Sequence, residues 1–288
     1  MGDLGYVHVD VFSNSPFGGN SLPVFPDARG LTSEQMLRIT QEMRHFETIF
    51  LEPTDRPGTV SARIFDLFEE LPFAGHPIIG AAAVLHRRSG RAGAQSWQFQ
   101  LASKTVEITT DVTADGYSGL LDQGAPEFLG SFDDRARVAT AFNIAVDDLA
   151  PDQPLEVVST GLRYLIVPVR PGVLARARIS HDITELVQGA GAQFAVLLDE
   201  AALEVRHWNN DGIIEDVATG SAAGTIGAYR LRHGLARGGD TFTLHQGQYT
   251  GRPSVLRVQP VGSPNMVETV KVGGDVAFVG HGVIDAPP

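Results

Sequence analysis

The sequence predicts an α+β protein built from two similar halves. Three observations support this: strand-like runs outnumber helical ones, two segments follow one plan, and each segment contains a helix of small residues. These segments, 63–90 and 206–234, lie about half the chain of 288 residues apart. Each runs from an arginine through a strand and an acidic loop to a glycine that opens the helix. We expect duplication, with each half wrapping its strands around one central helix.

Five stretches have the periodicity and end signals of helices. In the first, Thr32 or Ser33 can act as the N-cap of an amphipathic helix. In the second, Pro77 fits the first turn, and the lack of charge before His86 predicts burial nearly all round. The predicted helices span residues 31–43, 77–90, 132–144, 182–191 and 220–234.

Alternating patterns rich in valine, isoleucine and aromatic residues predict the strands. Residues 13–21, SNSPFGGNS, have the composition of a turn. The predicted strands span residues 6–12, 47–53, 61–68, 97–102, 104–112, 117–124, 155–161, 163–169, 194–200, 203–209, 241–249, 253–261, 268–274 and 276–284.

Composition excludes several classes of function. The net charge of −12 and the pI of about 5.1 argue against nucleic acid or an anionic membrane as a partner. With no cysteine in the chain, disulfides, thiolate nucleophiles and cysteine-ligated metals are excluded. The N-terminal residues show no signal-peptide pattern, and no apolar run reaches the ~18 residues of a membrane span. We expect a cytoplasmic protein.

Three polar residues are candidates for a catalytic role: Glu47, His76 and Asp216. Taken alone, each also fits an ordinary role, as a surface carboxylate, a half-buried helix-start histidine and a helix cap. The helix openings at His76-Pro77 and at 219–221 offer free N–H groups and a positive dipole end, which suit a carboxylate ligand. The alternative is that their glycines and alanines only allow close helix packing.

The sequence resembles the phenazine-biosynthesis isomerase (PhzF) family, within the diaminopimelate-epimerase-like fold, over essentially the whole chain. The motifs DVFSNSPFGGNSLPVF, ETIFL, RIF…ELPFAGHPIIGAA, EDVATGSAAG and QGQYTGRPS follow in the family's order. The resemblance implies two pseudo-symmetric halves, each a curled, mostly antiparallel sheet or barrel around a central helix, with the active site in the cleft between them. We expect the first half at 1–120, completed by about 277–288, the second at 121–276, and a homodimer.

Residue by residue, the resemblance makes Glu47 the catalytic acid/base and His76 and Asp216 its catalytic partners. It implies a small carboxylic acid as substrate and no metal or other cofactor. The sequence agrees, since it contains no dinucleotide, Walker or HExxH motif. The residues expected to bind substrate are Asn20, Phe46, Asp66, Gly75, Thr219, Gly220 and Ser221.

Departures from the family pattern affect the expected substrate. Phe46 replaces a frequent serine, Asp66-Leu67 replaces Thr-Pro, Ser21 replaces proline, and WNNDG at 208–212 replaces an apolar or Ser-Pro segment. We expect an isomerase that shifts a proton and a double bond in a dihydro-hydroxyanthranilate or in a cyclic imine or pyrroline carboxylate. The alternatives are an epimerase or lyase on the same frame, or a non-catalytic metabolite-binding protein. A two-thiol racemase mechanism is excluded because cysteine is absent.

Overall fold

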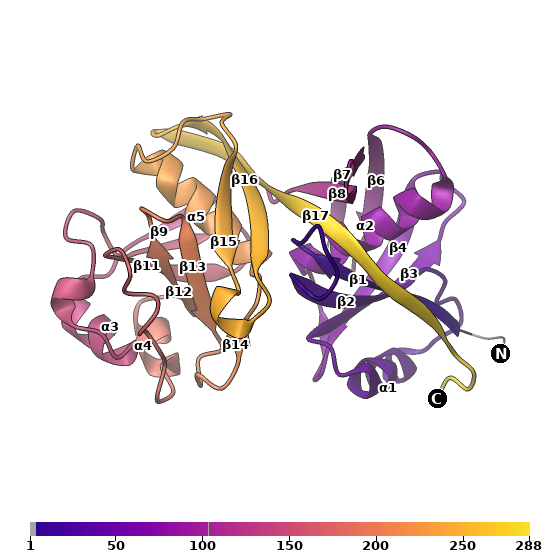
Figure 1. Ribbon diagram of the computed structural model, residues 1–288, viewed down its shortest axis with the longest axis horizontal. Coiled ribbons are helices and arrows are strands. Elements are labelled where there is room, and N and C mark those ends of the chain that lie inside the picture. Colours follow the sequence, from indigo (N-terminus) through magenta and orange to yellow (C-terminus); the bar gives the residue numbers. More distant parts are fainter. Residues whose placement is uncertain (1–3, 103) are drawn as a thin grey trace. The chain divides into compact units, whose positions relative to one another are not determined.

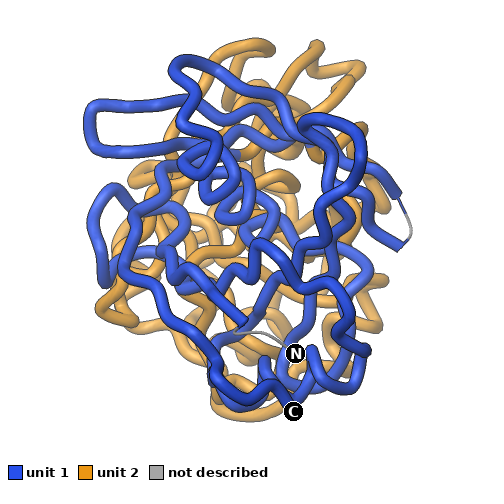
Figure 2. Tube along the Cα trace, turned by 90° about the vertical axis from the view of Figure 1, so that its right-hand side faces the viewer, with its two compact units in different colours: residues 1–122, 273–288 blue, residues 123–272 orange. Residues whose placement is uncertain are grey.

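A computed structural model describes residues 4–102 and 104–288. The chain divides into two compact units, residues 1–122 with 273–288 and residues 123–272 (Figures 1 and 2). The two-half α+β fold expected from the sequence is confirmed. The sequence placed the boundary at 120/121 and the return to the first half near 277, a few residues from the boundaries of the structure.

Unit 1 is a closed ring of strands around one helix. The ring runs β1, β2, β3, β4, β6, β7, β8, β17 and back to β1, and β5 pairs with β4 as a short hairpin. The elements are β1 Leu4–Val11, β2 Asn20–Phe25, α1 Ser33–Met43, β3 Glu47–Pro53, β4 Thr59–Asp66, β5 Glu70–Leu71, α2 Gly75–Ser89, β6 Gln95–Gln100, β7 Thr105–Thr113 and β8 Gly116–Asp122.

Helix α2 fills the ring, as the sequence predicted. It packs against β1, β2, β7 and β8, and every residue from His76 to Val84 is buried (Figure 1). A Cβ on Gly80 would lie 2.6 Å from Leu22 Cδ2, so a glycine is required there for close packing. Helix α1 covers the outer face, with Met36 and Ile39 in one buried cluster with aromatic residues of β2, β3 and β4. Thr32 is the N-cap of α1 and forms a capping box.

Unit 2 repeats the same order of pairing. In unit 1 the pairs β1–β2, β2–β3, β3–β4, β4–β6 and β6–β7 alternate between antiparallel and parallel. In unit 2 the pairs β10–β11, β11–β12, β12–β13, β13–β15 and β15–β16 alternate in the same way. The duplication inferred from the sequence is therefore a repeat of topology, with α5 in the place of α2.

The elements of unit 2 include short segments that the sequence patterns did not predict, such as β9 and β14. They are β9 Glu127–Ser131, α3 Arg135–Ala141, η1 Val146–Asp148, β10 Glu156–Ser159, β11 Arg163–Val169, α4 Thr184–Gly189, β12 Phe194–Asp199, β13 Glu204–Trp208, β14 Glu215–Asp216, α5 Gly220–Arg232, β15 Phe242–Gln246, η2 Gln248–Thr250, β16 Ser254–Ser263 and β17 Met266–Ile284.

Strand β17 corrects one prediction. The sequence predicted two strands, 268–274 and 276–284, with Asp275 between them, but β17 is continuous and contributes to both units. Gly273 serves close approach rather than a turn, since a Cβ there would lie 2.1 Å from the backbone oxygen of Gly119. Strand β2 corrects another, because no strand was predicted at Asn20–Phe25 and the predicted turn 13–21 overlaps its first two residues.

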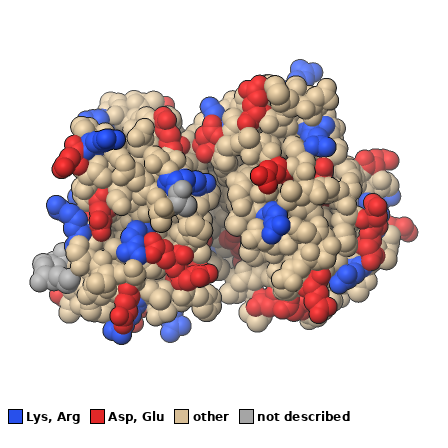
Figure 3. Space-filling model, turned by 180° about the vertical axis from the view of Figure 1, so that it is seen from behind, with Lys and Arg blue, Asp and Glu red and all other residues tan. Residues whose placement is uncertain are grey.

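Charge is spread over both units. On the face drawn in Figure 3, acidic and basic side chains are interspersed, and no extended basic area is visible on that face. No helix in the part of the chain that the structure describes is long and apolar enough to span a bilayer.

Candidate active site

A carboxylate and an imidazole meet at the start of α2 in unit 1. Glu47 is the first residue of β3, and His76 is the second residue of α2. The Nδ1 atom of His76 lies 3.1 Å from Oε2 of Glu47, and their side chains are 7% and 21% exposed. The structure therefore brings together two of the three predicted catalytic residues, and Glu47 keeps part of its side chain open to solvent.

The local sequence leaves the start of α2 without a side-chain cap. Ala74 is the N-cap in an extended conformation and forms no side-chain cap hydrogen bond. Pro77, the third helical residue, carries no N–H and so removes one of the donors that a helix start leaves unsatisfied. A Cβ on Gly75 would lie 3.7 Å from Leu121 Cδ2, an ordinary contact. Close packing therefore explains Gly80 but not Gly75.

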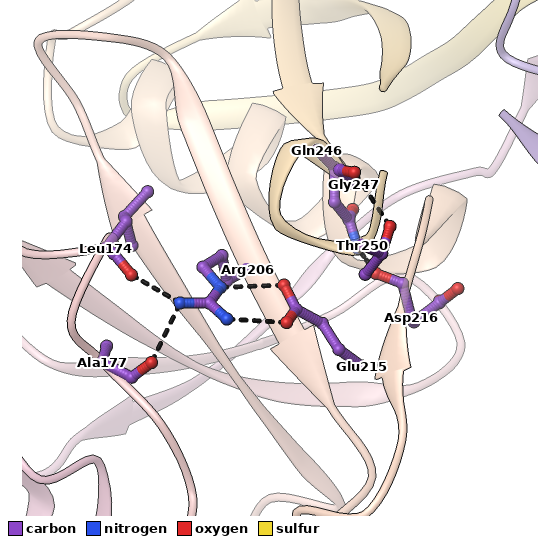
Figure 4. Close-up of polar contacts among 8 residues, drawn as sticks. All are labelled: Leu174, Ala177, Arg206, Glu215, Asp216, Gln246, Gly247 and Thr250. Carbon is purple, nitrogen blue, oxygen red and sulfur yellow. Dashed lines mark hydrogen bonds and ion pairs between the residues drawn. The ribbon is translucent and has the colours of Figure 1, made fainter. Parts of the chain in front are cut away.

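The third predicted catalytic residue lies in a hydrogen-bonded cluster of unit 2. Oδ2 of Asp216 accepts from the Thr219 hydroxyl at 2.6 Å, and Oδ1 accepts from the Ala218 N–H at 3.3 Å. The Gln246 side chain completes the cluster: its Nε2 donates to the Asp216 carbonyl and the Thr219 hydroxyl, both at 2.9 Å, and its Oε1 accepts from the Thr219 N–H at 2.9 Å. Figure 4 shows Gln246 and Asp216 side by side. We call Asp216, Thr219 and Gln246 the Asp216 cluster.

The start of α5 carries a second hydroxyl pair. The Ser221 Oγ lies 2.8 Å from the Tyr164 hydroxyl of β11. The Gly220 carbonyl accepts from Nε2 of Gln123 at 2.9 Å, and Oε1 of the same amide accepts from the Thr160 hydroxyl. Ser221 is the second residue of its helix, which is also the position of His76 in α2.

Three other predicted residues have different surroundings. Asn20 is buried at the start of β2, with 2% exposure. Asp66 is the register partner of Glu47 on β4, but its Oδ1 accepts from the backbone N–H groups of Phe68 and Glu69 and so closes the β4–β5 turn. Phe46 precedes Glu47 and is 41% exposed.

The sequence did not single out Gln246, Tyr164 or His207. Gln246 lies in the QGQYTGRPS motif, which was the available signal, whereas Tyr164 lies in a strand that looks like ordinary core. His207 of β13 is the register partner of Asp216. Burial lowers the pKa of His207, with the charges of Asp216 and Glu215 opposing the shift, and its Nδ1 donates to the Ala195 carbonyl at 2.9 Å.

Comparisons with known proteins place the chain in a family. A model of the phenazine biosynthesis-like (PhzC-PhzF) proteins matches residues 9–282. A trans-2,3-dihydro-3-hydroxyanthranilate isomerase of Pseudomonas chlororaphis is 30% identical over 97% of this chain and 98% of its own. An uncharacterised isomerase of Escherichia coli (strain K12) is 31% identical over 95% and 96%. A solved structure from Pseudomonas aeruginosa, described as a predicted epimerase, has a TM-score of 0.91 and 44% identity, with 98% and 99% of the chains covered.

The fold and these relatives define an isomerase with two topologically equivalent halves. The chain belongs to the PhzF family of phenazine biosynthesis-like proteins.

Proposed function

We propose that this protein is a cofactor-independent isomerase that moves a proton and a double bond within a small unsaturated cyclic carboxylic acid. Glu47 is the acid/base. The observation that carries the proposal is the 3.1 Å contact between Glu47 and His76 at the uncapped start of α2.

The reaction needs one proton acceptor that later becomes a donor. A Glu47 carboxylate oxygen takes the proton from an sp³ carbon next to a π system, and the electrons of the C–H bond move into that system. The protonated Glu47 then returns the proton to the far end of the conjugated system, so that the double bond has moved and no atom is gained or lost. His76 holds Oε2 through Nδ1 and so orients the carboxylate for both steps.

The two helix starts are proposed to bind anionic or polar groups of the substrate. Backbone N–H groups at Gly75 and His76 point from a helix end that carries partial positive charge. In unit 2, Gly220 and Ser221 offer the same arrangement, with the Ser221 hydroxyl held by Tyr164. Within the Asp216 cluster, the carboxylate is oriented by Thr219 and is proposed to bind a polar group of the substrate or to shuttle a proton.

The name of the Pseudomonas chlororaphis relative supports a dihydro-hydroxyanthranilate as the substrate class. A cyclic imine or pyrroline carboxylate fits the same chemistry and is the second substrate class we propose. The description of the Pseudomonas aeruginosa structure favours a second function, epimerisation. An epimerase would exchange a proton with solvent and invert a stereocentre while the double-bond pattern stays unchanged.

Proton NMR in D₂O tests these functions. The purified protein is incubated with trans-2,3-dihydro-3-hydroxyanthranilate and, separately, with a panel of unsaturated cyclic amino acids. A shifted double-bond pattern supports the isomerase, and exchange with inversion but without a shift supports the epimerase. The absence of any change with every compound would contradict both functions.

The matched variants are Glu47→Gln and Glu52→Gln, which lie on the same strand. We expect Glu47→Gln to lower kcat by about 10³-fold or more, since it removes the proton carrier, while ligand affinity stays within about tenfold. Glu52→Gln should keep wild-type kcat. A Glu47→Gln variant with wild-type turnover would contradict the assignment of Glu47 as the acid/base.

A homodimer in solution and a cytoplasmic location stay predictions. We also propose a role in the biosynthesis of an antibiotic-type metabolite. Light scattering coupled to size-exclusion chromatography measures the first directly. Fractionation of the producing cells measures the second.

A further inference from the structure

Two short hairpins, one in each unit, share a detailed plan. In β4–β5 and in β13–β14, an aspartate in the turn accepts the backbone N–H two residues later: Phe68 donates to Asp66, and Ile213 donates to Asp211. A glutamate follows each aspartate by four positions, and the central helix begins five positions after that glutamate. The hairpins thus lead directly into the two helix starts that the proposed function uses.

Each hairpin is closed by an ion pair between an arginine and a glutamate, and the two pairs have the same geometry. In unit 1, Nε of Arg63 donates to Oε1 of Glu70 at 2.8 Å, and its Nη2 donates to the other oxygen. In unit 2, Arg206 donates to Glu215 through the same two nitrogens, at 2.8 and 2.6 Å. Each guanidinium also lies over the ring two residues later, at 5.2 Å in unit 1 and 4.3 Å in unit 2. Such two-pronged pairing fixes the angle as well as the distance between the partners.

The unit 2 pair is built far more tightly than its counterpart. The side chains of Arg206 and Glu215 are 9% and 13% exposed, against 27% and 34% for the pair in unit 1. Nη1 of Arg206 also donates to the Leu174 and Ala177 carbonyls at 2.5 and 2.9 Å, as Figure 4 shows. The guanidinium carbon lies 4.3 Å from the Tyr249 ring centroid as well as 4.3 Å from that of Trp208.

Arg206 contacts both segments that hold the Asp216 cluster. Glu215 directly precedes Asp216 in β14, and Tyr249 lies in η2, three residues after Gln246. The Gln246 side chain in turn donates to the Asp216 carbonyl and to the Thr219 hydroxyl, and it accepts from the Thr219 N–H. A shift of either segment would change the geometry of the Asp216 carboxylate.

We propose that Arg206 is a positioning residue that fixes β14 and η2 to each other and so orients the Asp216 carboxylate for turnover. Its catalytic consequence rests on the proposed function; its structural consequence does not. A buried ion pair is a poor way to gain stability, because desolvating both charges offsets most of their attraction, and apolar residues of similar volume often do as well. What the pair adds is a defined geometry, and here that geometry includes the segment next to Asp216.

The experiment removes the guanidinium and then returns it from solution. Arg206→Ala leaves a space between Trp208 and Tyr249 that free guanidinium ion fits, whereas urea has the same shape but no charge. Hydrogen exchange is followed at the amides of Ala218 and Thr219, which donate to Asp216 and Gln246. We expect exchange at these two amides to accelerate by about tenfold or more in Arg206→Ala. Millimolar guanidinium should restore protection, and urea should not.

Turnover is measured on the same samples with whichever substrate the wild type converts. We expect kcat per folded molecule to fall while KM changes little, with recovery on adding guanidinium. A variant that is merely less stable would keep its kcat per folded molecule. Arg176→Ala, which removes a more exposed ion pair with Asp148 in unit 2, is the control for activity. If neither the wild type nor Arg206→Ala converts any compound, the proposed function fails, and the exchange data still decide whether Arg206 positions the Asp216 cluster.

Arg63→Ala is the matched control for exchange. It should loosen the amides of Phe68 and Glu69 in its own hairpin and leave those of Ala218 and Thr219 unchanged. If Arg206→Ala does not fold, Glu215→Gln replaces it, since the amide oxygen still accepts one N–H; a smaller change at the same two amides is then expected. Wild-type exchange at Ala218 and Thr219 in a folded variant would overturn the inference, as would a loss of protection that guanidinium does not restore.

Discussion

A substitution at Thr219 can remove the hydrogen bonds of the Asp216 cluster while leaving the packing of the side chain unchanged. Thr219→Val keeps the shape and removes the hydroxyl, which donates to Asp216 at 2.6 Å and accepts from Gln246 at 2.9 Å. The residue is 7% exposed, so water replaces these partners poorly. A hydrogen bond to a carboxylate contributes about 1.5–3 kcal/mol and a neutral one about 1 kcal/mol. We therefore expect unit 2 to lose about 2–4 kcal/mol of unfolding free energy.

The assay uses the two tryptophans of the chain, Trp97 in unit 1 and Trp208 in unit 2. In a Trp97→Phe background, fluorescence during urea denaturation reports the unfolding of unit 2 alone. Thr219→Ser in the same background is the control, because it keeps the hydroxyl and should lose less than about 1 kcal/mol, the transfer free energy of one methyl group. A Thr219→Val protein within that margin of the wild type would show that the two hydrogen bonds carry no net stability, and the reasoning would be refuted.

Two further predictions concern burial. The lowered pKa of His207 means that the unfolded chain binds a proton more readily than the folded one, so unfolding free energy falls as pH drops below about 6.5, the ordinary histidine pKa. His207→Gln should weaken this fall between neutral and mildly acid pH in the same urea assay; an unchanged pH dependence would assign it to other groups. In unit 1, Gly80→Ala gains about 1 kcal/mol of helix propensity but forces a Cβ to 2.6 Å from Leu22, an overpacking cost of about 1–3 kcal/mol. We expect Gly80→Ala to lower the unfolding free energy. In a chain that also carries Leu22→Ala, the same substitution should cost less, because the side chain it contacts is gone. If the effects of the two substitutions are additive, the contact does not cause the loss.

The sequence predicted the elements with strong periodicity and missed those set by pairing. The strands at 47–53 and 163–169 have the predicted bounds because alternating or continuous apolar runs end at clear turn residues. Strands β5 and β14 have two residues each and carry no periodicity, yet they form the hairpins that lead into α2 and α5. The sequence patterns divided β17 at Asp275, because sequence alone does not show the backbone that packs against Gly273.

The same limit applies to the site. Glu47 and His76 were predicted from motifs and a resemblance, and their 3.1 Å contact follows from a strand start and a helix start meeting in the fold. Gln246 and Tyr164 are hydrogen-bonded to residues far away in the chain, Thr219 and Ser221; a family motif contains Gln246, but nothing in the local sequence indicates either contact. Residues whose type suits the proposed chemistry can be found in the sequence, whereas the residues that hold them in place are found only from the register between strands.

The register between strands also bears on the choice between isomerisation and epimerisation. The register pair Ile49–Ile64 of unit 1 is equivalent to the pair Val196–His207 of unit 2. Glu47 lies two residues before Ile49, so its equivalent in unit 2 is Phe194, two residues before Val196. Counting one strand further, Asp216 in unit 2 corresponds to Leu71 in unit 1. The duplicated frame therefore carries its acids at non-equivalent positions, and no symmetric pair of bases of the kind that two-base inversion uses is retained among these equivalents. This asymmetry supports the part of the proposed function in which one carboxylate both removes and returns the proton, as a double-bond shift requires, rather than two opposed bases inverting a stereocentre.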